Sequence, residues 1–274
     1  MENITLRIPF SIPLLGESFI DVGNPVLFST INFFTEVDVN FSKSSVAHVP
    51  LSSPSLKRLV ENHLNSIGKP FAFQVSPPGH DYLTLTSALY IAASESLEDH
   101  APAFLSRLSG RSLMTMVRSL SALSGGFVVC RKGEGLVSLS GNPDASVLLR
   151  TKARRRFLRG AIGRFNEAFP DLSQPLWHTM GHIVIEGGRA IKENNPRKLG
   201  YLMILESSIG CAIGLIKPKD LARLSRIKVA YGAKIVSFGD LTGDLILSQR
   251  ETSPWGEYQK FYFTTTGVNE VHES

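Results

Sequence analysis

Seven basic side chains and no acidic side chain lie between residues 150 and 164. They are Arg150, Lys152, Arg154, Arg155, Arg156, Arg159 and Arg164. This density of positive charge is typical of a surface that binds phosphate groups, of a small molecule or of a nucleic acid. It is also typical of a solvated helix face. Only Phe157 and Phe165 are interleaved, which gives little support to base stacking. We therefore expect a phosphorylated small molecule rather than a nucleic acid as the partner.

Histidine and cysteine residues are the other candidates for chemistry. His178 and His182 are four residues apart on an expected helix, a spacing that can hold a metal ion, but no third ligand accompanies them. We expect no metal. Cys130 and Cys211 are the only two cysteines, which excludes a disulfide scaffold and disfavours a cysteine-rich zinc site. Both lie in apolar stretches, so we expect buried free thiols and a reducing compartment.

Composition places these residues in a folded, soluble protein. The chain has 274 residues, of which 43% are hydrophobic and 19% charged, so global disorder is excluded. The net charge of +5 favours anionic ligands only weakly. No apolar stretch reaches the roughly 18 residues that a membrane helix needs. The first residues, MENITLRIPF, make a poor signal peptide. We expect a cytoplasmic protein with no membrane partner.

The expected elements mix strands and helices along the whole chain. Strands are predicted over residues 4–8, 26–41, 71–75, 127–130, 136–139, 233–237, 244–249 and 258–265. Helices are predicted over residues 56–67, 84–97, 112–123, 154–169, 176–193, 198–210 and 219–230. Strands and helices interspersed with hairpins favour an α+β fold over a doubly wound sheet.

Three segments, in order, resemble the GHMP kinase superfamily, which includes the mevalonate kinases and the mevalonate diphosphate decarboxylases. Residues 8–18 and then 23–27 resemble the opening strand of that family, its Gly-Glu-His turn and the Gly-x-Pro-Val/Ala-Leu that follows. Residues 123–128 are similar to the strand after the long helix. Residues 231–247 resemble the Gly-Ala-Lys strand-loop-strand near the family's C-terminus, and residues 189–203 resemble its lead-in.

The resemblance implies a GHMP-kinase-like two-domain α+β fold. Its N-terminal half would be like the second domain of ribosomal protein S5 and its C-terminal half ferredoxin-like. We place these halves at residues 1–150 and 151–274. Homodimers are common among such proteins, so a homodimer is an open expectation here.

The segment that corresponds to the ATP loop departs from the family pattern. Kinases of the family hold phosphates on a glycine-rich loop, because glycine lets the backbone approach the phosphates closely. Here the segment over residues 77–88 keeps only Gly79 of those glycines, and it carries Asp81, Tyr82, Leu83 and Leu85. Bulky side chains and a negative charge oppose an ATP site. We therefore expect no nucleotide and no other cofactor.

Two residues are the candidates for catalysis. The kinases have an aspartate seven residues before the first glycine of the Gly-Gly-Phe segment, and Arg118 stands at that position here. A guanidinium does not deprotonate an alcohol, but it can grip a carboxylate or a phosphate with two parallel hydrogen bonds. The resemblance also places Asp240 within about two positions of the essential aspartate of the decarboxylases. Ser121 stands where the decarboxylases carry their arginine.

One branch of the superfamily fits a chain that has lost its ATP loop. A mevalonate 3,5-bisphosphate decarboxylase of archaeal type receives a substrate that is already phosphorylated, and it releases isopentenyl phosphate, phosphate and carbon dioxide. We expect Glu17, Ser18, Ser121, Lys132, Lys234 and Ser237 to contact the substrate. One alternative is an ATP-dependent small-molecule kinase or phosphomevalonate decarboxylase. The other is a non-catalytic protein that binds a phosphorylated ligand or RNA.

Overall fold

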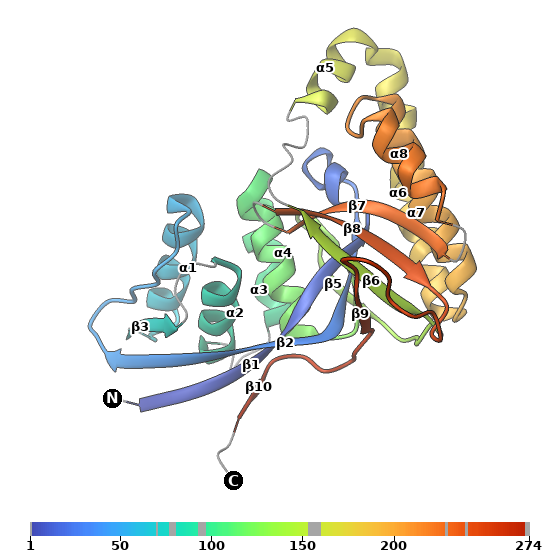
Figure 1. The fold of residues 1–274 in the computed structure, drawn as a ribbon. Coiled ribbons are helices and arrows are strands. Elements are labelled where there is room, and N and C mark those ends of the chain that lie inside the picture. The colour runs from blue at the N-terminus through green and yellow to red at the C-terminus, as the bar shows by residue number, and fades with distance from the viewer. Residues whose placement is uncertain are drawn as a thin grey trace. The chain divides into compact units, whose positions relative to one another are not determined.

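The computed structural model describes residues 2–69, 71–76, 81–92, 97–152, 160–227, 230–238 and 241–271 (Figure 1). Contacts between Cα atoms divide the chain into two compact units. Unit 1 comprises residues 1–11, 30–138 and 264–274, and unit 2 comprises residues 12–29 and 139–263. Each unit is therefore built from separated stretches of sequence. The predicted division after residue 150 falls inside a strand, and as a statement about domains it stays a prediction.

The first sheet orders its strands β10-β1-β2-β4-β5, and β3 also pairs with β2. The strands are β1 (Glu2–Leu15), β2 (Val26–Lys43), β3 (Phe71–Ser76), β4 (Phe127–Arg131), β5 (Gly135–Leu139) and β10 (Asn269–Glu270). In the β2–β3 ladder Val39 pairs with Val75 and Phe41 with Phe73. Val39 and Val75 are both buried, as expected of β-branched side chains on the face of a sheet that packs against a core.

Among the described residues of unit 1, four segments are helical. They are α1 (Pro54–Ser66), α2 (Asp81–Ala92), α3 (Leu97–Ser106) and α4 (Gly110–Ser124). Helix α1 begins after Ser53, whose hydroxyl caps the Leu56 amide, and Pro54 occupies the first turn. Helix α4 ends at Gly125, which has φ +71° and lies so close to Thr265 that a Cβ would meet its carbonyl oxygen at 2.5 Å.

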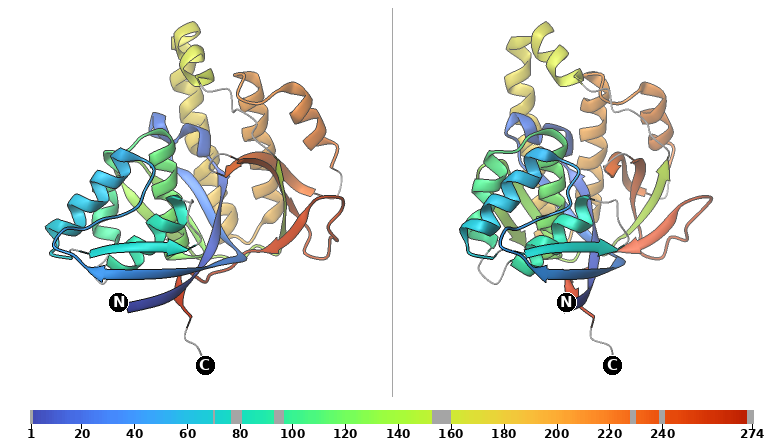
Figure 2. Two further views of the ribbon diagram at one scale, coloured as in Figure 1. Left: turned by 60° about the vertical axis from the view of Figure 1, so that its left-hand side comes forward. Right: turned by 90° about the vertical axis from the view of Figure 1, so that its left-hand side faces the viewer.

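Unit 2 contains the second sheet, with strand order β7-β8-β6-β9. Its strands are β6 (Ser146–Lys152), β7 (Ala230–Phe238), β8 (Leu241–Ser248) and β9 (Gln259–Tyr262). Its helices are the 3-10 helix η1 (Glu17–Val22), α5 (Ala161–Ala168), α6 (Pro170–Lys192), α7 (Pro196–Ala212) and α8 (Pro218–Ser225). Helices α6 and α7 lie side by side, and α7 packs against β7 (Figure 2).

A buried carboxylate joins three elements of unit 2. Asp244 on β8 is 1% exposed and accepts hydrogen bonds from Arg150 on β6 and Arg223 on α8. The hydroxyl of Tyr258 donates to the same carboxylate at 3.2 Å, and the Arg150 guanidinium lies over the Tyr258 ring. The first basic residue of the run over residues 150–164 is therefore an internal partner of Asp244. The part of that run over residues 153–159, and with it the first half of the helix predicted from Arg154, lies outside the described residues.

The structure corrects several of the predicted elements. The strand β6 and the helix α3 were not predicted. The helix predicted over residues 219–230 ends at Ser225, and β7 begins at Ala230. Of the two thiols expected to be buried, Cys130 is buried and Cys211 is only half-buried. Among the described residues, no helix is both long enough and apolar enough to cross a bilayer.

Candidate functional site

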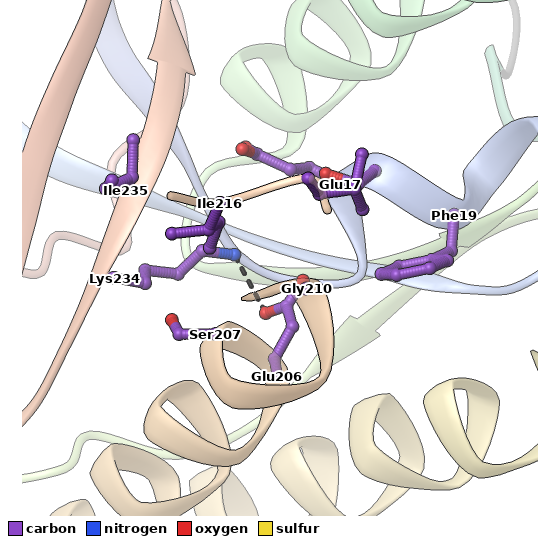
Figure 3. A pocket seen from close by; sticks show the side chains of 10 residues that line it. Glu17, Phe19, Glu206, Ser207, Gly210, Ile216, Lys234 and Ile235 are labelled. Carbon is purple, nitrogen blue, oxygen red and sulfur yellow. Dashed lines mark hydrogen bonds and ion pairs between the residues drawn. The ribbon is translucent and has the colours of Figure 1, made fainter. Parts of the chain in front are cut away.

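A small pocket lies within unit 2, between η1, α7 and β7 (Figure 3). It encloses about 290 Å³ that atoms do not fill, part of which is open to solvent. Its lining residues are Glu17, Ser18, Phe19, Glu206, Ser207, Gly210, Leu215, Ile216, Lys234 and Ile235. Three of the six residues predicted to bind substrate, Glu17, Ser18 and Lys234, are thus brought together here.

A glycine turn positions the first two of these residues. Gly16 precedes η1 and has φ +83°, a conformation that residues with a Cβ rarely adopt. A Cβ on Gly16 would also meet the Pro25 carbonyl oxygen at 2.4 Å. The Gly16 N–H donates to Oε1 of Glu206 at 2.9 Å. The turn therefore fixes the positions of Glu17 and Ser18. The hydrogen bond from Gly16 to Glu206 attaches this turn to α7.

The same carboxylate of Glu206 holds the ammonium group of Lys234. The Nζ atom of Lys234 donates to Oε2 of Glu206 at 2.8 Å, and both side chains are buried (Figure 3). A lysine ammonium has three N–H donors, so the hydrogen bond to Glu206 leaves donors for a ligand. Glu206 was not predicted as a site residue, because in the sequence it only interrupts an apolar stretch. Its partners, Gly16 and Lys234, are 190 and 28 residues away.

Arg118 lies in unit 1, on α4, and is only 7% exposed. Its Nη2 atom donates to the Ser11 carbonyl at 3.2 Å. The guanidinium carbon lies 5.4 Å from the centre of the Phe10 ring and 5.2 Å from that of the Tyr82 ring. Aromatic faces attract a cation and hold it in orientation. Tyr82 in turn donates its hydroxyl to the Pro9 carbonyl at 2.6 Å, and burial raises the pKa of Tyr82, so the phenol stays neutral.

Two buried hydroxyl groups accompany Arg118 in unit 1. Ser121 lies one helical turn further along α4, and Ser11 supplies the carbonyl that Arg118 contacts. Both serines are fully buried, and among the described residues neither hydroxyl has a hydrogen-bond partner. Buried polar atoms are normally paired, and an unpaired one requires an explanation. A guanidinium and an unpartnered hydroxyl are both groups that can donate hydrogen bonds to a carboxylate or a phosphate.

For the remaining predicted site residues, the structure gives only a position in the fold, or the residue lies outside the described part of the chain. Lys132 is half-buried in the turn between β4 and β5, in unit 1. Ser237 lies on β7, where its backbone pairs with Thr242 of β8. Asp240 and residues 77–80 of the segment compared with the ATP loop lie outside the described residues. The roles predicted for these residues stay predictions.

The structure also places the histidine pair that was predicted on a helix, on α6. The His178 and His182 rings lie 5.8 Å apart, and both side chains are exposed. Within the described part of the chain, no three histidine, cysteine, aspartate or glutamate side chains gather as a metal ion would need.

Several solved structures that share this fold are named as mevalonate enzymes. A mevalonate diphosphate decarboxylase from Staphylococcus aureus is similar with a TM-score of 0.66 and 13% identity, over 99% of this chain and 98% of that one. A mevalonate kinase from L. major in complex with R-mevalonate gives 0.60 and 15%, over 88% and 86%. A mevalonate-3-kinase from Thermoplasma acidophilum, with mevalonate 3-phosphate and ADP bound, gives 0.57 and 11%, over 99% of both chains.

These likenesses establish the fold of the chain. It is the GHMP-kinase fold, and the predicted α+β class is confirmed. No protein-family model matches the sequence, and no curated protein does.

Proposed function

We propose that this protein is an enzyme that acts on a phosphorylated mevalonate, and in particular an ATP-independent decarboxylase of mevalonate 3,5-bisphosphate. The fold supports an enzyme of the mevalonate type, because diphosphate decarboxylases and mevalonate kinases share it along most of the chain. The observation that carries the finer proposal is the buried Arg118 with the hydroxyls of Ser11 and Ser121. These groups are suited to an anion, and none of the three is a carboxylate that could activate an alcohol for phosphorylation.

The proposed reaction needs no nucleotide because its leaving group is already in place. The bond between the tertiary carbon and the phosphate oxygen breaks, and phosphate leaves with the electron pair. The bond between the carboxylate carbon and its neighbour then supplies the electrons of the new double bond. The products are isopentenyl phosphate, inorganic phosphate and carbon dioxide. The substrate carries a charge of roughly −4 to −5 at neutral pH, so several N–H and O–H donors must hold it.

Arg118 accelerates this reaction most by holding the leaving phosphate. An interaction speeds a reaction only where it is stronger in the transition state than in the bound substrate. Negative charge grows on the phosphate as the carbon–oxygen bond breaks, whereas it disappears from the carboxylate as carbon dioxide forms. A guanidinium on the phosphate therefore lowers the barrier, and one on the carboxylate opposes the reaction. The hydroxyls of Ser11 and Ser121 would donate to the same phosphate oxygens.

The other predicted residues complete the proposal. Lys234 and Ser18 offer donors in the unit 2 pocket, and Lys132 and Ser237 are further candidates for the phosphates. Asp240 would face the positive charge that develops at the tertiary carbon. Glu17 supplies a second carboxylate in the unit 2 pocket, so it must contact a hydroxyl rather than a phosphate of the ligand.

Phosphorus NMR of the purified protein with mevalonate 3,5-bisphosphate, without ATP or added metal, tests the proposal. We expect inorganic phosphate and isopentenyl phosphate to appear together and in equal amounts. Arg118→Met and Asp240→Asn should each slow their release by 10²-fold or more while the proteins remain folded. Full activity in both variants would refute the site. No release from the wild-type protein would refute the reaction.

The likeness to mevalonate kinases favours one alternative, an ATP-dependent kinase or phosphomevalonate decarboxylase. The same experiment with ATP, magnesium ions and mevalonate or its monophosphates separates the two. Production of ADP would then support the alternative. Absence of turnover under both conditions would leave a binding protein on a kinase fold.

A further inference from the structure

We propose that Glu206 is a positioning residue, which holds both the Lys234 ammonium and the Gly16–Ser18 turn in the arrangement that a phosphorylated ligand requires. This inference rests on the proposed function in that the ligand is a phosphorylated small molecule. Glu206 would not touch the reacting atoms. It acts through the two groups that its carboxylate oxygens bind.

The geometry divides the two oxygens between two elements. Oε1 accepts the backbone N–H of Gly16, and Oε2 accepts the Lys234 ammonium. Glu206 itself is on α7, whereas Gly16 leads into η1 and Lys234 is on β7. One side chain therefore sets the relative positions of three segments that line the same pocket (Figure 3).

Because Glu206 and Lys234 are buried, a ligand cannot easily replace the contact between them. Glu206 is 5% exposed and Lys234 is 3% exposed. Removing one partner of such a pair leaves an uncompensated buried charge and is strongly destabilising, whereas removing both partners is often nearly neutral. A phosphate that enters the pocket would therefore add to the Lys234–Glu206 contact rather than replace it. Lys234 would meet the phosphate with the donors that Glu206 does not use.

Substitution of Glu206 and Lys234 should affect stability and ligand affinity differently. The variants Glu206→Gln and Lys234→Met should each lower the urea midpoint of unfolding, and the double variant should recover most of that loss. Affinity should behave differently, because the double variant has no ammonium to meet a phosphate. We expect Glu206→Gln and the double variant to bind inorganic pyrophosphate at least tenfold more weakly than the wild-type protein, as measured by calorimetry. The Michaelis constant for mevalonate 3,5-bisphosphate should rise by a similar factor.

A surface pair on neighbouring helices provides the matched control. Lys198 on α7 contacts Glu186 on α6 at 2.9 Å, and both side chains are one third exposed. The double variant Glu186→Gln/Lys198→Met makes the same chemical change outside the pocket. It should bind pyrophosphate within twofold of the wild-type protein.

Hydrogen exchange tests the second contact without any ligand. The amide of Gly16 should exchange slowly in the wild-type protein and in Glu206→Gln, since the glutamine oxygen can still accept its hydrogen bond. It should exchange at least tenfold faster in Glu206→Ala. Equal protection in all three proteins would overturn the role of Glu206 in holding the turn.

Measurements of pyrophosphate binding also distinguish a positioning role of Glu206 from a purely structural one. Recovery of pyrophosphate affinity together with stability in the Glu206→Gln/Lys234→Met variant would overturn the inference, because the pair would then be only structural. Failure of the wild-type protein to bind pyrophosphate would also overturn it. A wild-type protein that binds pyrophosphate but leaves mevalonate 3,5-bisphosphate unchanged would refute the proposed reaction and retain the role of Glu206.

Discussion

The carboxylate of Asp244 and the guanidinium of Arg223 form a bidentate ion pair. Nη1 of Arg223 lies 2.5 Å from Oδ2 of Asp244, and Nη2 lies 2.7 Å from Oδ1. The hydrogen bonds to Asp244 raise the pKa of the Arg223 guanidinium above its ordinary value. Arg150 adds a third close contact, from Nη2 to Oδ2 at 2.6 Å. A single carboxylate thus fastens α8 and β6 to β8.

Replacement of this carboxylate should destabilise unit 2. Asp244→Asn removes the negative charge and leaves two guanidinium groups without their common partner. Because the Arg150 and Arg223 side chains are 21% and 32% exposed, water can solvate them in part. We therefore expect a loss of about 2–4 kcal/mol, somewhat below that for a fully buried pair. Urea unfolding followed by circular dichroism measures it.

The control for this variant is the outer carboxylate near Arg150. Glu257 is 82% exposed and lies 3.9 Å from the Arg150 guanidinium. Glu257→Gln should change stability by less than about 0.5 kcal/mol, because exposed ion pairs contribute little. Equal effects of the two substitutions would contradict the importance that we give to burial at Asp244.

Arg118 should be essential to turnover because of its geometry as well as its charge. Arg118→Lys keeps the charge but loses the planar fork that can hold two oxygens at once. We expect Arg118→Lys to retain part of the activity, and Arg118→Met to lose 10²-fold or more, about 2.7 kcal/mol of transition-state stabilisation. The exposed Arg111 on the same helix supplies the control. Arg111→Met should leave kcat/KM within twofold of wild type.

The contact between α7 and β7 should not tolerate a side chain at Gly200. A Cβ there would lie 2.3 Å from the carbonyl carbon and oxygen of Tyr231, and backbone atoms in a sheet cannot move aside. Gly200→Ala should cost about 3 kcal/mol or prevent folding. Gly163→Ala on α5, where no neighbouring atom lies within 4 Å, should instead stabilise the protein by about 0.5–1 kcal/mol. Thermal unfolding of the two variants distinguishes the cases, and a stable Gly200→Ala variant would contradict this packing.

One histidine should make stability depend on pH. Burial, and to a smaller degree the neighbouring His100, lower the pKa of His63 below its ordinary value of 6.5. The two rings lie 4.6 Å apart. Because the unfolded chain takes up this proton at a higher pH than the folded protein does, stability is complete above about pH 7 and falls as the pH drops below 6.5.

The size of this effect should be under about 1 kcal/mol, since His63 is only partly buried. Urea unfolding between pH 8 and pH 5 measures it. His63→Gln should flatten the profile in that range, whereas substitution of the exposed His178 by Gln should not. A profile that is unchanged by His63→Gln would show that other groups govern the dependence.

Local patterns in the sequence predicted many of the elements. The long strand β2 and the helices α1 and α4 lie within a few residues of their predicted bounds. Two elements extend beyond their predicted bounds. Strand β1 continues past the predicted residues 4–8, through Pro9 and Pro13, to Leu15. Helix α6 begins at Pro170 and contains Pro175, although the predicted helix began only after both prolines.

Less of the candidate site than of the fold could be predicted from the sequence. Arg118 and Lys234 could be predicted as site residues, because each stands at a fixed spacing within a sequence motif that resembles one of a known family. The partners of these residues are not visible in this way. Glu206 bonds to groups 28 and 190 residues away, and Asp244 bonds to Arg150, 94 residues earlier. The role of a buried polar residue depends on partners that are distant in the sequence. The local sequence pattern shows only that the residue interrupts an apolar run.

The interleaving of the two units has a consequence for synthesis on the ribosome. Unit 2 takes residues 12–29 from near the start of the chain and completes them with residues up to 263. Unit 1 includes β10, which pairs with β1 across more than 260 residues. Neither unit can therefore fold completely before most of the chain has been synthesised. Until then, the early strands have edges without their partner strands. Nascent chains of this protein should engage chaperones until nearly all of the sequence has emerged.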